Sequence, residues 1–316
     1  MPLDPQIVQV METVAALGLP SADTVSPEEA RANARLRKRS PGPEVAKVED
    51  RNIPGPDSDV PVRIYTPEGN GPFPILAWFH GGGWVVGDLD SADGTARNLC
   101  VGGQCIVISV DYRLAPDTKF PGPADDCWAA TTWAVNNAAA INGDPSQLAV
   151  GGDSAGGNLA AAMSLMAADR GGPEIALQVL IYPVTDVNFN TVSYNDNAEG
   201  YSLTKVGMQW YWEHYLANQE DASNPYAAPM QAKSLVGQPP ALVITAEYDP
   251  LRDEGEAYAK RLSEAGVATT ATRYDGVIHG FFSMAAVVDK SQQAVDEASA
   301  ALRNAFSKAS SPSAAD

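Results

Sequence analysis

Residues 148–157 read Leu-Ala-Val-Gly-Gly-Asp-Ser-Ala-Gly-Gly, a short apolar run that ends in glycines around one serine. The Ala-rich stretch that follows predicts a helix from Ala155 to about Asp169. A serine at the turn between a strand and a helix takes up strained backbone angles, and Gly152 and Gly156 leave room where a Cβ would collide. The stretch therefore predicts a nucleophile elbow that exposes the hydroxyl of Ser154 at a helix N-terminus, where amides and dipole favour negative charge.

The plainer interpretation of a Gly-x-Ser-x-Gly stretch is a simple turn. The β-like run before it and the helical run after it are the context that a catalytic serine requires, and they favour the functional interpretation. A serine hydroxyl also needs a base, usually a histidine that is held by a buried carboxylate.

The chain has three histidines. His214 lies in an aromatic helical stretch with no carboxylate-bearing loop nearby, so we expect it to pack or to lie on the surface. His80 precedes three glycines and is expected to hold that loop. His279 follows a β-like run and precedes a helical tail, so it is the predicted base by elimination and by position.

If the chain has the α/β-hydrolase fold, the orienting acid comes between the serine and the histidine in chain order. Asp249 follows the apolar run 242–246, and Pro250 keeps it out of the next helix. Glu247 lies too close to the strand, and Asp253 falls in the first helical turn, where a carboxylate complements the dipole. Asp249 is therefore the predicted acid, although a role as helix N-cap is compatible with the same position.

The oxyanion of acyl transfer needs hydrogen-bond donors. Residues 74–79 read as a strand, and His-Gly-Gly-Gly-Trp follows at 80–84. Glycines bring bare amides close to a ligand, and this loop type pairs with the amide of the residue after the nucleophile, here Ala155. A Gly-Gly-Gly string alone is more often a flexible loop, but its place after a strand and before an elbow predicts an oxyanion hole.

Together these motifs resemble those of the bacterial hormone-sensitive-lipase-like (family IV) carboxylesterases, within the α/β-hydrolase superfamily. The matching stretches are 80–83 (His-Gly-Gly-Gly), 152–156 (Gly-Asp-Ser-Ala-Gly), 249–255 (Asp-Pro-Leu-Arg-Asp-Glu-Gly), 279–281 (His-Gly-Phe), 111–116 (Asp-Tyr-Arg-Leu-Ala-Pro) and 182–183 (Tyr-Pro). The resemblance implies Ser154 as nucleophile, His279 as general base and then acid, and Asp249 as orienter. It also implies an oxyanion hole, formed by the amides of Gly82, Gly83 and Ala155, with Gly81 able to share the role.

The same resemblance gives roles to residues around these motifs. Asp111 and Arg113 are expected to brace the glycine loop from beneath rather than to form a surface charge pair. We expect the substrate pocket to involve Trp84, Asp153, Tyr182, Trp210 and Ile278.

Strand-like runs alternate with helical ones along the chain, which predicts an α/β fold with a mostly parallel sheet and helices on both faces. The runs are 60–65, 75–79, 105–110, 148–151, 177–182, 242–246 and 268–274. The first alternates in polarity and favours an antiparallel edge strand. The catalytic domain is expected over 46–185 and 231–306, with a disordered tail at 307–316.

Two segments, 1–45 and 186–230, do not fit this repeating unit. The first predicts helices over 4–17 and 27–39, and the second helix carries Arg31, Arg35, Arg37, Lys38 and Arg39. The second segment contains an aromatic helix with Trp210, Tyr211, Trp212 and Tyr215. The family resemblance implies that both segments form a helical cap over the serine, whereas an aromatic helix that packs only in the core is the alternative.

The 316 residues include 39 acidic and 21 basic side chains, for a net charge of −18. This charge disfavours nucleic acid and anionic membranes as partners and leaves small neutral esters, although solubility alone explains it as well. Three cysteines without metal-like spacing, Cys100, Cys105 and Cys127, are expected as buried apolar residues. With no signal peptide or long apolar span in the sequence, we expect a cytoplasmic protein without cofactor or metal.

The sequence therefore predicts a serine carboxylesterase that hydrolyses short- to medium-chain esters through an acyl-enzyme on Ser154. A true lipase or an amidase would use the same triad, and a non-catalytic receptor on this fold is a further alternative. The family resemblance also suggests a homodimer through the sheet edge near residues 268–274.

Overall fold

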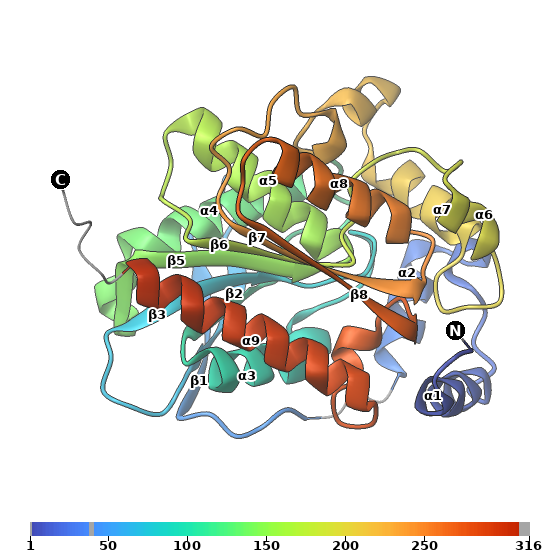
Figure 1. The fold of residues 1–316 in the computed structure, drawn as a ribbon, viewed down its shortest axis with the longest axis horizontal. Coiled ribbons are helices and arrows are strands. Elements are labelled where there is room, and N and C mark those ends of the chain that lie inside the picture. The colour runs from blue at the N-terminus through green and yellow to red at the C-terminus, as the bar shows by residue number, and fades with distance from the viewer. Residues whose placement is uncertain (1, 38–40, 310–316) are drawn as a thin grey trace.

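An eight-stranded sheet with helices on both faces organises the protein (Figure 1). The computed structural model describes residues 2–37 and 41–309. The strand order is β1-β2-β4-β3-β5-β6-β7-β8. The strands are β1 (Lys47–Ile53), β2 (Val60–Thr66), β3 (Phe73–Phe79), β4 (Ile106–Val110), β5 (Gly143–Asp153), β6 (Leu177–Ile181), β7 (Ala241–Tyr248) and β8 (Thr269–Ile278).

The six strands from β4 to β8 along the sheet run parallel, whereas β2 lies antiparallel to both β1 and β4. The predicted antiparallel orientation of residues 60–65 is confirmed, but their predicted place at the edge is wrong, because β1 lies outside β2. The sequence of β1 is polar, and Ile53 is its one buried residue. Such a strand buries few side chains, so its sequence lacks the apolar pattern that would predict a strand.

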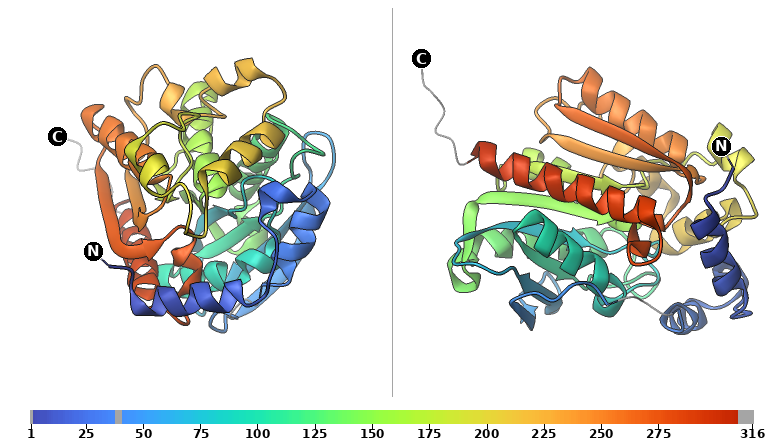
Figure 2. Two further views of the ribbon diagram at one scale, coloured as in Figure 1. Left: turned by 90° about the vertical axis from the view of Figure 1, so that its right-hand side faces the viewer. Right: turned by 60° about the horizontal axis from the view of Figure 1, so that its bottom comes forward.

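The central strands β4 and β6 are buried at every position. Continuous apolar runs of this kind suit parallel strands that are covered on both faces. One face is covered by α3 (Leu89–Gly103) and α9 (Asp289–Ala309), and the other by α4 (Gly122–Asn136), α5 (Ala155–Arg170) and α8 (Arg252–Glu264) (Figures 1 and 2). The sheet thus separates two hydrophobic cores, one for each layer of helices.

The two segments outside the repeating unit supply the helices at the carboxyl ends of the parallel strands (Figures 1 and 2). Residues 1–45 contain α1 (Pro5–Ala15), the 3₁₀ turn η1 (Ala22–Thr24) and α2 (Pro27–Arg35), and residues 186–230 contain α6 (Val192–Asp196) and α7 (Lys205–Tyr215). Further 3₁₀ turns are η2 (Ala138–Ile141), η3 (Gln219–Ser223), η4 (Pro229–Gln231) and η5 (Phe281–Met284). The helix α7 contacts η1, so the two segments meet although they lie far apart in the sequence.

Local signals explain where these helices begin. Asp4 caps α1, Ser26 caps α2 and Thr204 caps α7, each with a side-chain oxygen that accepts a backbone amide hydrogen bond. At the other end of the chain, α9 continues to Ala309, so residues 307–309 of the tail are helical rather than disordered. Residues 310–316, Lys38 and Arg39 lie outside the described residues.

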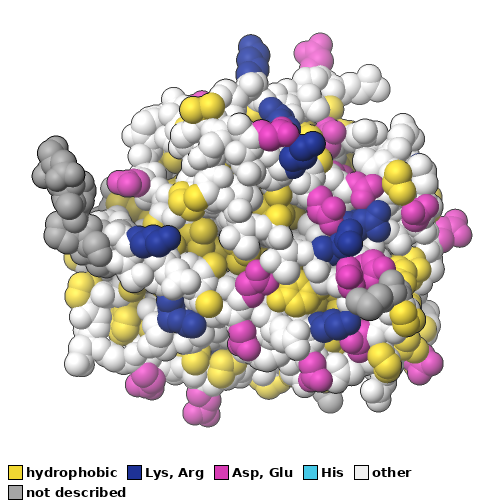
Figure 3. Space-filling model, in the orientation of Figure 1, with side chains coloured by type: hydrophobic (Ala, Val, Ile, Leu, Met, Phe, Trp, Pro, Cys, Tyr) yellow, Lys and Arg dark blue, Asp and Glu magenta, His cyan; other side chains and the backbone are white. Residues whose placement is uncertain are grey.

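The acidic side chains on one face of the molecule are dispersed (Figure 3). On the face in Figure 3, acidic side chains lie among basic and apolar ones rather than beside one continuous basic surface. Among the helices of the described chain, none combines the length and apolar character that crossing a bilayer would need.

Candidate active site

Ser154 sits at the turn between β5 and α5 with φ 57° and ψ −119°, which is the strained conformation predicted for a nucleophile elbow. The two flanking glycines are required by close backbone approach. A Cβ on Gly152 would lie 2.3 Å from the carbonyl oxygen of Gly156, and a Cβ on Gly156 would lie 1.9 Å from that of Phe79. The elbow is therefore wedged against the end of β3.

The predicted triad is assembled by hydrogen bonds. His279 Nε2 lies 2.9 Å from Ser154 Oγ, and His279 Nδ1 lies 2.7 Å from Asp249 Oδ2. Asp249 is fully buried and accepts a second hydrogen bond, from the Leu251 amide, at 2.8 Å. Because an ionised carboxylate only accepts, Nδ1 donates to Asp249, which leaves Nε2 to accept the serine proton.

The other carboxylates near the predicted acid have different contacts. Glu247 accepts a hydrogen bond from the Gly276 amide at 2.7 Å. Asp253 lies in the first turn of α8 and accepts a hydrogen bond from the Ser193 amide. His214 contacts the Trp210 carbonyl and ring, as expected of a packing residue. The structure thus brings together Ser154, Asp249 and His279.

The ring of Tyr182 lies against the imidazole of His279, with the centroids 4.5 Å apart. Tyr182 has φ 33°, an unfavourable backbone angle for a residue with a side chain, and it is 1 % exposed. It packs behind the imidazole, together with Phe281.

The amides of the glycine loop after β3 have two different environments. The Gly81 amide donates to Asp153 Oδ1 at 3.0 Å, so the residue before the nucleophile holds the loop. Gly82 and Gly83 have φ 122° and 58°, which favour glycine. Within the described residues, the amides of Gly82, Gly83 and Ala155 have no protein acceptor.

The predicted brace beneath this loop comes from the middle residue of the Asp-Tyr-Arg motif. Tyr112 donates its hydroxyl to the His80 carbonyl at 2.7 Å, and the two rings stack with centroids 4.4 Å apart. Arg113 instead binds Asp126 on α4 and Asp57. The prediction of a brace from Asp111 and Arg113 is therefore wrong in its residues, because the tyrosine between them holds the loop.

Aromatic residues of α7 cover the glycine loop from outside. Trp84 is fully buried and stacks on Tyr215, with centroids 4.0 Å apart and ring planes within 3°. A Cβ on Gly83 would lie 2.2 Å from the ring of Tyr211, so that ring contacts the loop directly. Among the residues predicted for the pocket, Trp84, Tyr182 and Ile278 are at most 1 % exposed, and Trp210 is half-buried beside Tyr211.

Sequence reasoning did not single out Tyr211 for the pocket. The helical spacing is a signal for Tyr211, because Tyr211 and Tyr215 lie four residues apart and therefore share one side of the helix. Trp210 lies on a different side, where its ring contacts that of His214 at a tilt of 39°.

The helix α2 is tied to the chain that follows the glycine loop. Arg31 donates to the carbonyls of Val85 and Ala115, both at 2.8 Å, and to Asp117 at 2.6 Å. The N-terminal segment is thereby bonded to the same loop that α7 covers.

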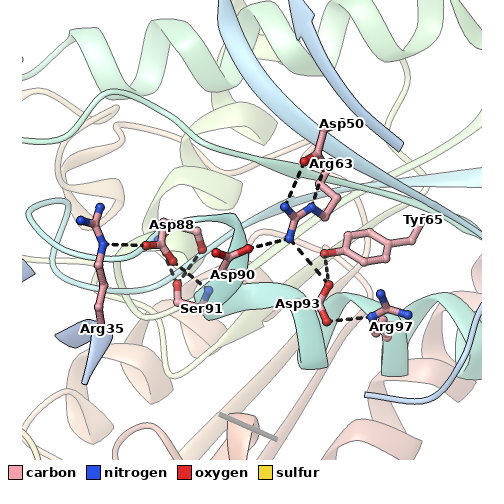
Figure 4. Close-up of polar contacts among 9 residues, drawn as sticks. All are labelled: Arg35, Asp50, Arg63, Tyr65, Asp88, Asp90, Ser91, Asp93 and Arg97. Carbon is pink, nitrogen blue, oxygen red and sulfur yellow. Dashed lines mark hydrogen bonds and ion pairs between the residues drawn. The ribbon is translucent and has the colours of Figure 1, made fainter. Parts of the chain in front are cut away.

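Beside the glycine loop lies a network of charged residues (Figure 4). Asp88 caps α3 and pairs with Arg35 of α2 at 3.2 Å, and Arg63 of β2 pairs with Asp50 and Asp90. The network as drawn comprises Arg35, Asp50, Arg63, Tyr65, Asp88, Asp90, Ser91, Asp93 and Arg97. It links α2, β1, β2 and the start of α3.

Asp111 lies near this network. Burial, together with the charges of Asp88 and Asp90, raises the pKa of Asp111 to about 6. Its carboxylate is therefore disfavoured in the folded protein.

Comparison with known proteins agrees with this geometry. A family profile described as the alpha/beta hydrolase fold matches residues 76–283. The chain is 39 % identical to the carboxylesterase NlhH of Mycobacterium tuberculosis, over 96 % of this chain and 96 % of the relative. It is also 39 % identical to the carboxylic ester hydrolase LipN of the same organism, over 97 % of this chain and 84 % of the relative.

A solved structure is similar along the whole chain as well. The ester hydrolase EH1AB1 from the metagenome of Lake Arreo, complexed with a derivative of bipyridine phosphonate, superposes with a TM-score of 0.91 at 41 % identity. The match covers 96 % of this chain and 99 % of that one. With the hydrogen-bonded Ser-His-Asp set in place, the chain belongs to the hormone-sensitive-lipase-like carboxylesterases of the α/β-hydrolase superfamily and is a serine carboxylesterase.

Proposed function

We propose that Ser154 attacks the ester carbonyl while His279 takes its proton, and that Asp249 stabilises the imidazolium that forms. The imidazolium then gives the proton to the leaving alcohol, which leaves an acyl group on Ser154 Oγ. A water that the same imidazole activates attacks the acyl-enzyme and releases the acid. The observation that carries this scheme is the continuous hydrogen-bonded chain from Asp249 through His279 to Ser154.

The amides of Gly82, Gly83 and Ala155 are proposed as the oxyanion hole. Their lack of a protein acceptor among the described residues supports this role, since an oxyanion would satisfy them. The amide of Gly81 already donates to Asp153, so we leave it out of the proposed hole.

Substrates are proposed to be esters with short or medium acyl chains, held in a pocket that α7 covers. The contact of Tyr211 with Gly83 supports a cap role for the two helical segments, because it places an aromatic ring beside the proposed oxyanion hole. A panel of p-nitrophenyl esters of increasing chain length tests the proposal, and activity should be highest at the short end. A preference for emulsified long-chain triglycerides would instead identify a lipase, and comparable hydrolysis of the matching amides would identify an amidase.

Covalent labelling tests the nucleophile directly. A serine-directed phosphonate should label the wild-type chain stoichiometrically and should not label Ser154→Ala. The complex of a relative with a phosphonate derivative supports the choice of probe. Lack of labelling and of turnover in the folded wild-type protein would favour the non-catalytic receptor.

We further propose a cytoplasmic enzyme that forms a homodimer through β8. The dimer is supported by the position of β8 at the end of the sheet, where it pairs with β7. The cytoplasmic location is supported by the thiols of Cys100, Cys105 and Cys127, which are free and buried and so suit a reducing compartment. Light scattering should give twice the monomer mass, and the monomer mass would contradict the dimer.

A further inference from the structure

The segment 185–197, which includes α6, lies against the loop that carries the proposed catalytic acid. Ser193, in α6, is fully buried, and Asn197, at its C-terminal end, is 4 % exposed. Both side chains reach across to residues 249–253, more than fifty positions later in the chain. A surface segment of this length does not bury two polar side chains without giving them partners.

Ser193 bonds the acid loop at three points. Its hydroxyl donates to the Pro250 carbonyl at 2.6 Å and accepts from the Asp253 amide at 3.2 Å. Its own amide donates to Asp253 Oδ2 at 2.7 Å. One serine therefore fixes both the turn after Asp249 and the first turn of α8.

Asn197 bonds the acid itself. Its side-chain amide donates to the main-chain carbonyl of Asp249 at 3.3 Å. Among the described residues, the carboxylate of Asp249 has two hydrogen-bond partners, the Leu251 amide and His279 Nδ1. The hydrogen bonds from the side chains of Ser193 and Asn197 to main-chain carbonyls of the acid loop restrain the backbone that carries this carboxylate.

A second anchor lies at the start of the segment. Glu254, 3 % exposed, accepts hydrogen bonds from the amides of Thr185 and Asp186 at 2.6 and 3.3 Å. The Thr185 hydroxyl donates back to the Glu254 carbonyl at 3.0 Å. Burial raises the pKa of the Glu254 carboxyl well above its usual range. The segment is thus fastened to α8 at its start and to the acid loop at its end.

We propose that Ser193 and Asn197 are positioning residues that hold the Asp249 backbone so that its carboxylate stays aligned with His279 Nδ1. The proposal rests on the triad mechanism above. Alignment matters because the carboxylate stabilises the charge that develops on the imidazole during the reaction, and a displacement of about 1 Å can lower a rate by about a hundredfold. Loss of either side chain lowers kcat more than it raises KM, since neither touches the reacting atoms.

The test compares Ser193→Ala and Asn197→Ala with Asn195→Ala. Asn195 is an exposed asparagine in the same helix, and its side chain accepts from Lys205 rather than contacting the acid loop. We expect kcat to fall about fivefold in Ser193→Ala and about tenfold in Asn197→Ala, with KM within about twofold of wild type in both. The Asn195→Ala control should match wild type in kcat and KM.

A spectroscopic measurement separates positioning from general loosening. The proton between His279 Nδ1 and Asp249 should give a far-downfield proton NMR signal, which should weaken or move upfield in Ser193→Ala and Asn197→Ala but not in Asn195→Ala. Wild-type kcat in the folded Ser193→Ala and Asn197→Ala proteins, or a lowered kcat with an unchanged signal, would overturn the proposal. If Asn197→Ala does not fold, Ser193→Ala decides alone. Retained turnover in Ser154→Ala would instead refute the triad mechanism, so the two failures are distinguishable.

Discussion

Asp153 accepts a hydrogen bond from the amide of Gly81, 72 positions earlier in the chain, so the residue next to the nucleophile also fixes the loop of the proposed oxyanion hole. A Cβ on Gly81 would lie 2.3 Å from Asp153 Oδ2 and 3.0 Å from the Asp153 carbonyl oxygen, which shows how closely Asp153 approaches the glycine loop. The nucleophile and the glycine loop are therefore held as one unit.

Substitution of Asp153 should impair turnover through this loop. Asp153→Ala is expected to lower kcat by about ten- to a hundredfold, because the glycine amides lose their register with the developing oxyanion. Asp153→Asn keeps an acceptor oxygen and should lose less. Steady-state kinetics on a short-chain ester measure both variants, and an unchanged kcat in Asp153→Ala would contradict the role of the hydrogen bond.

The assignment of the acid predicts a contrast between neighbours. Asp249→Asn should lower kcat by about 10³–10⁴-fold, since an amide at this place favours the wrong imidazole tautomer. Glu247→Gln keeps an acceptor for the Gly276 amide and should stay within about threefold of wild type. If the two variants show the reverse order of kcat, the acid is misassigned.

The wedge between the elbow and β3 predicts a stability defect. Gly156→Ala places a Cβ 1.9 Å from the Phe79 carbonyl oxygen, and neither backbone can move easily, so we expect a loss of more than about 3 kcal/mol in the free energy of unfolding. Gly171→Ala is the control, because nothing lies within 4 Å of its Cβ and it bears only the strain of φ 61°, about 1–2 kcal/mol. Urea unfolding followed by circular dichroism compares the two, and equal losses would argue against a rigid wedge.

Asp111 makes stability depend on pH. Its pKa is raised from 3.8 to about 6 in the fold, so the folded state binds its proton more tightly than the unfolded state does. Stability from this group is therefore greatest below about pH 4, falls as pH rises to about 6, and is level above. Because Asp111 keeps partial access to solvent, we expect Asp111→Asn to stabilise the protein at pH 8 by only about 1 kcal/mol.

Thermal unfolding of Asp111→Asn at pH 4 and pH 8 measures this effect. The gain over wild type should be present at pH 8 and absent at pH 4. Asp59→Asn, at an exposed position, should show no such difference. A gain that is equal at both pH values would mean that ionisation is not its cause.

The triad set could be predicted from the sequence because each member carries a local signal. A strained serine needs Gly152 and Gly156 beside it, the acid follows an apolar strand, and the base follows a β-like run. The strand β1 was missed because a polar strand at the sheet edge buries only Ile53. Its pairing is decided by main-chain bonds to β2 that its side chains do not reveal.

The contacts of the cap segments could not be predicted from the sequence, for a different reason. The position of Tyr211 on Gly83 depends on where α7 lies, and α7 packs against Trp84 and against η1, which come far earlier in the chain. The bonds from Ser193 and Asn197 to the acid loop join side chains to main-chain carbonyls. Main-chain partners leave no residue-type pattern in the sequence, so only the folded chain shows them.

The nucleophile and the base of the triad follow strands that differ in their number of neighbouring strands. Ser154 follows β5, which is bonded on both sides within the sheet, whereas His279 follows β8, which pairs with β7 at the end of the sheet. Strands with a single neighbour open at a lower free-energy cost than interior ones. On warming of the monomer, the imidazole should thus lose its position before the rest of the fold unfolds, and heat inactivation should begin below the temperature of global denaturation. A dimer through β8 would remove this difference, because the strand would then gain a second neighbour.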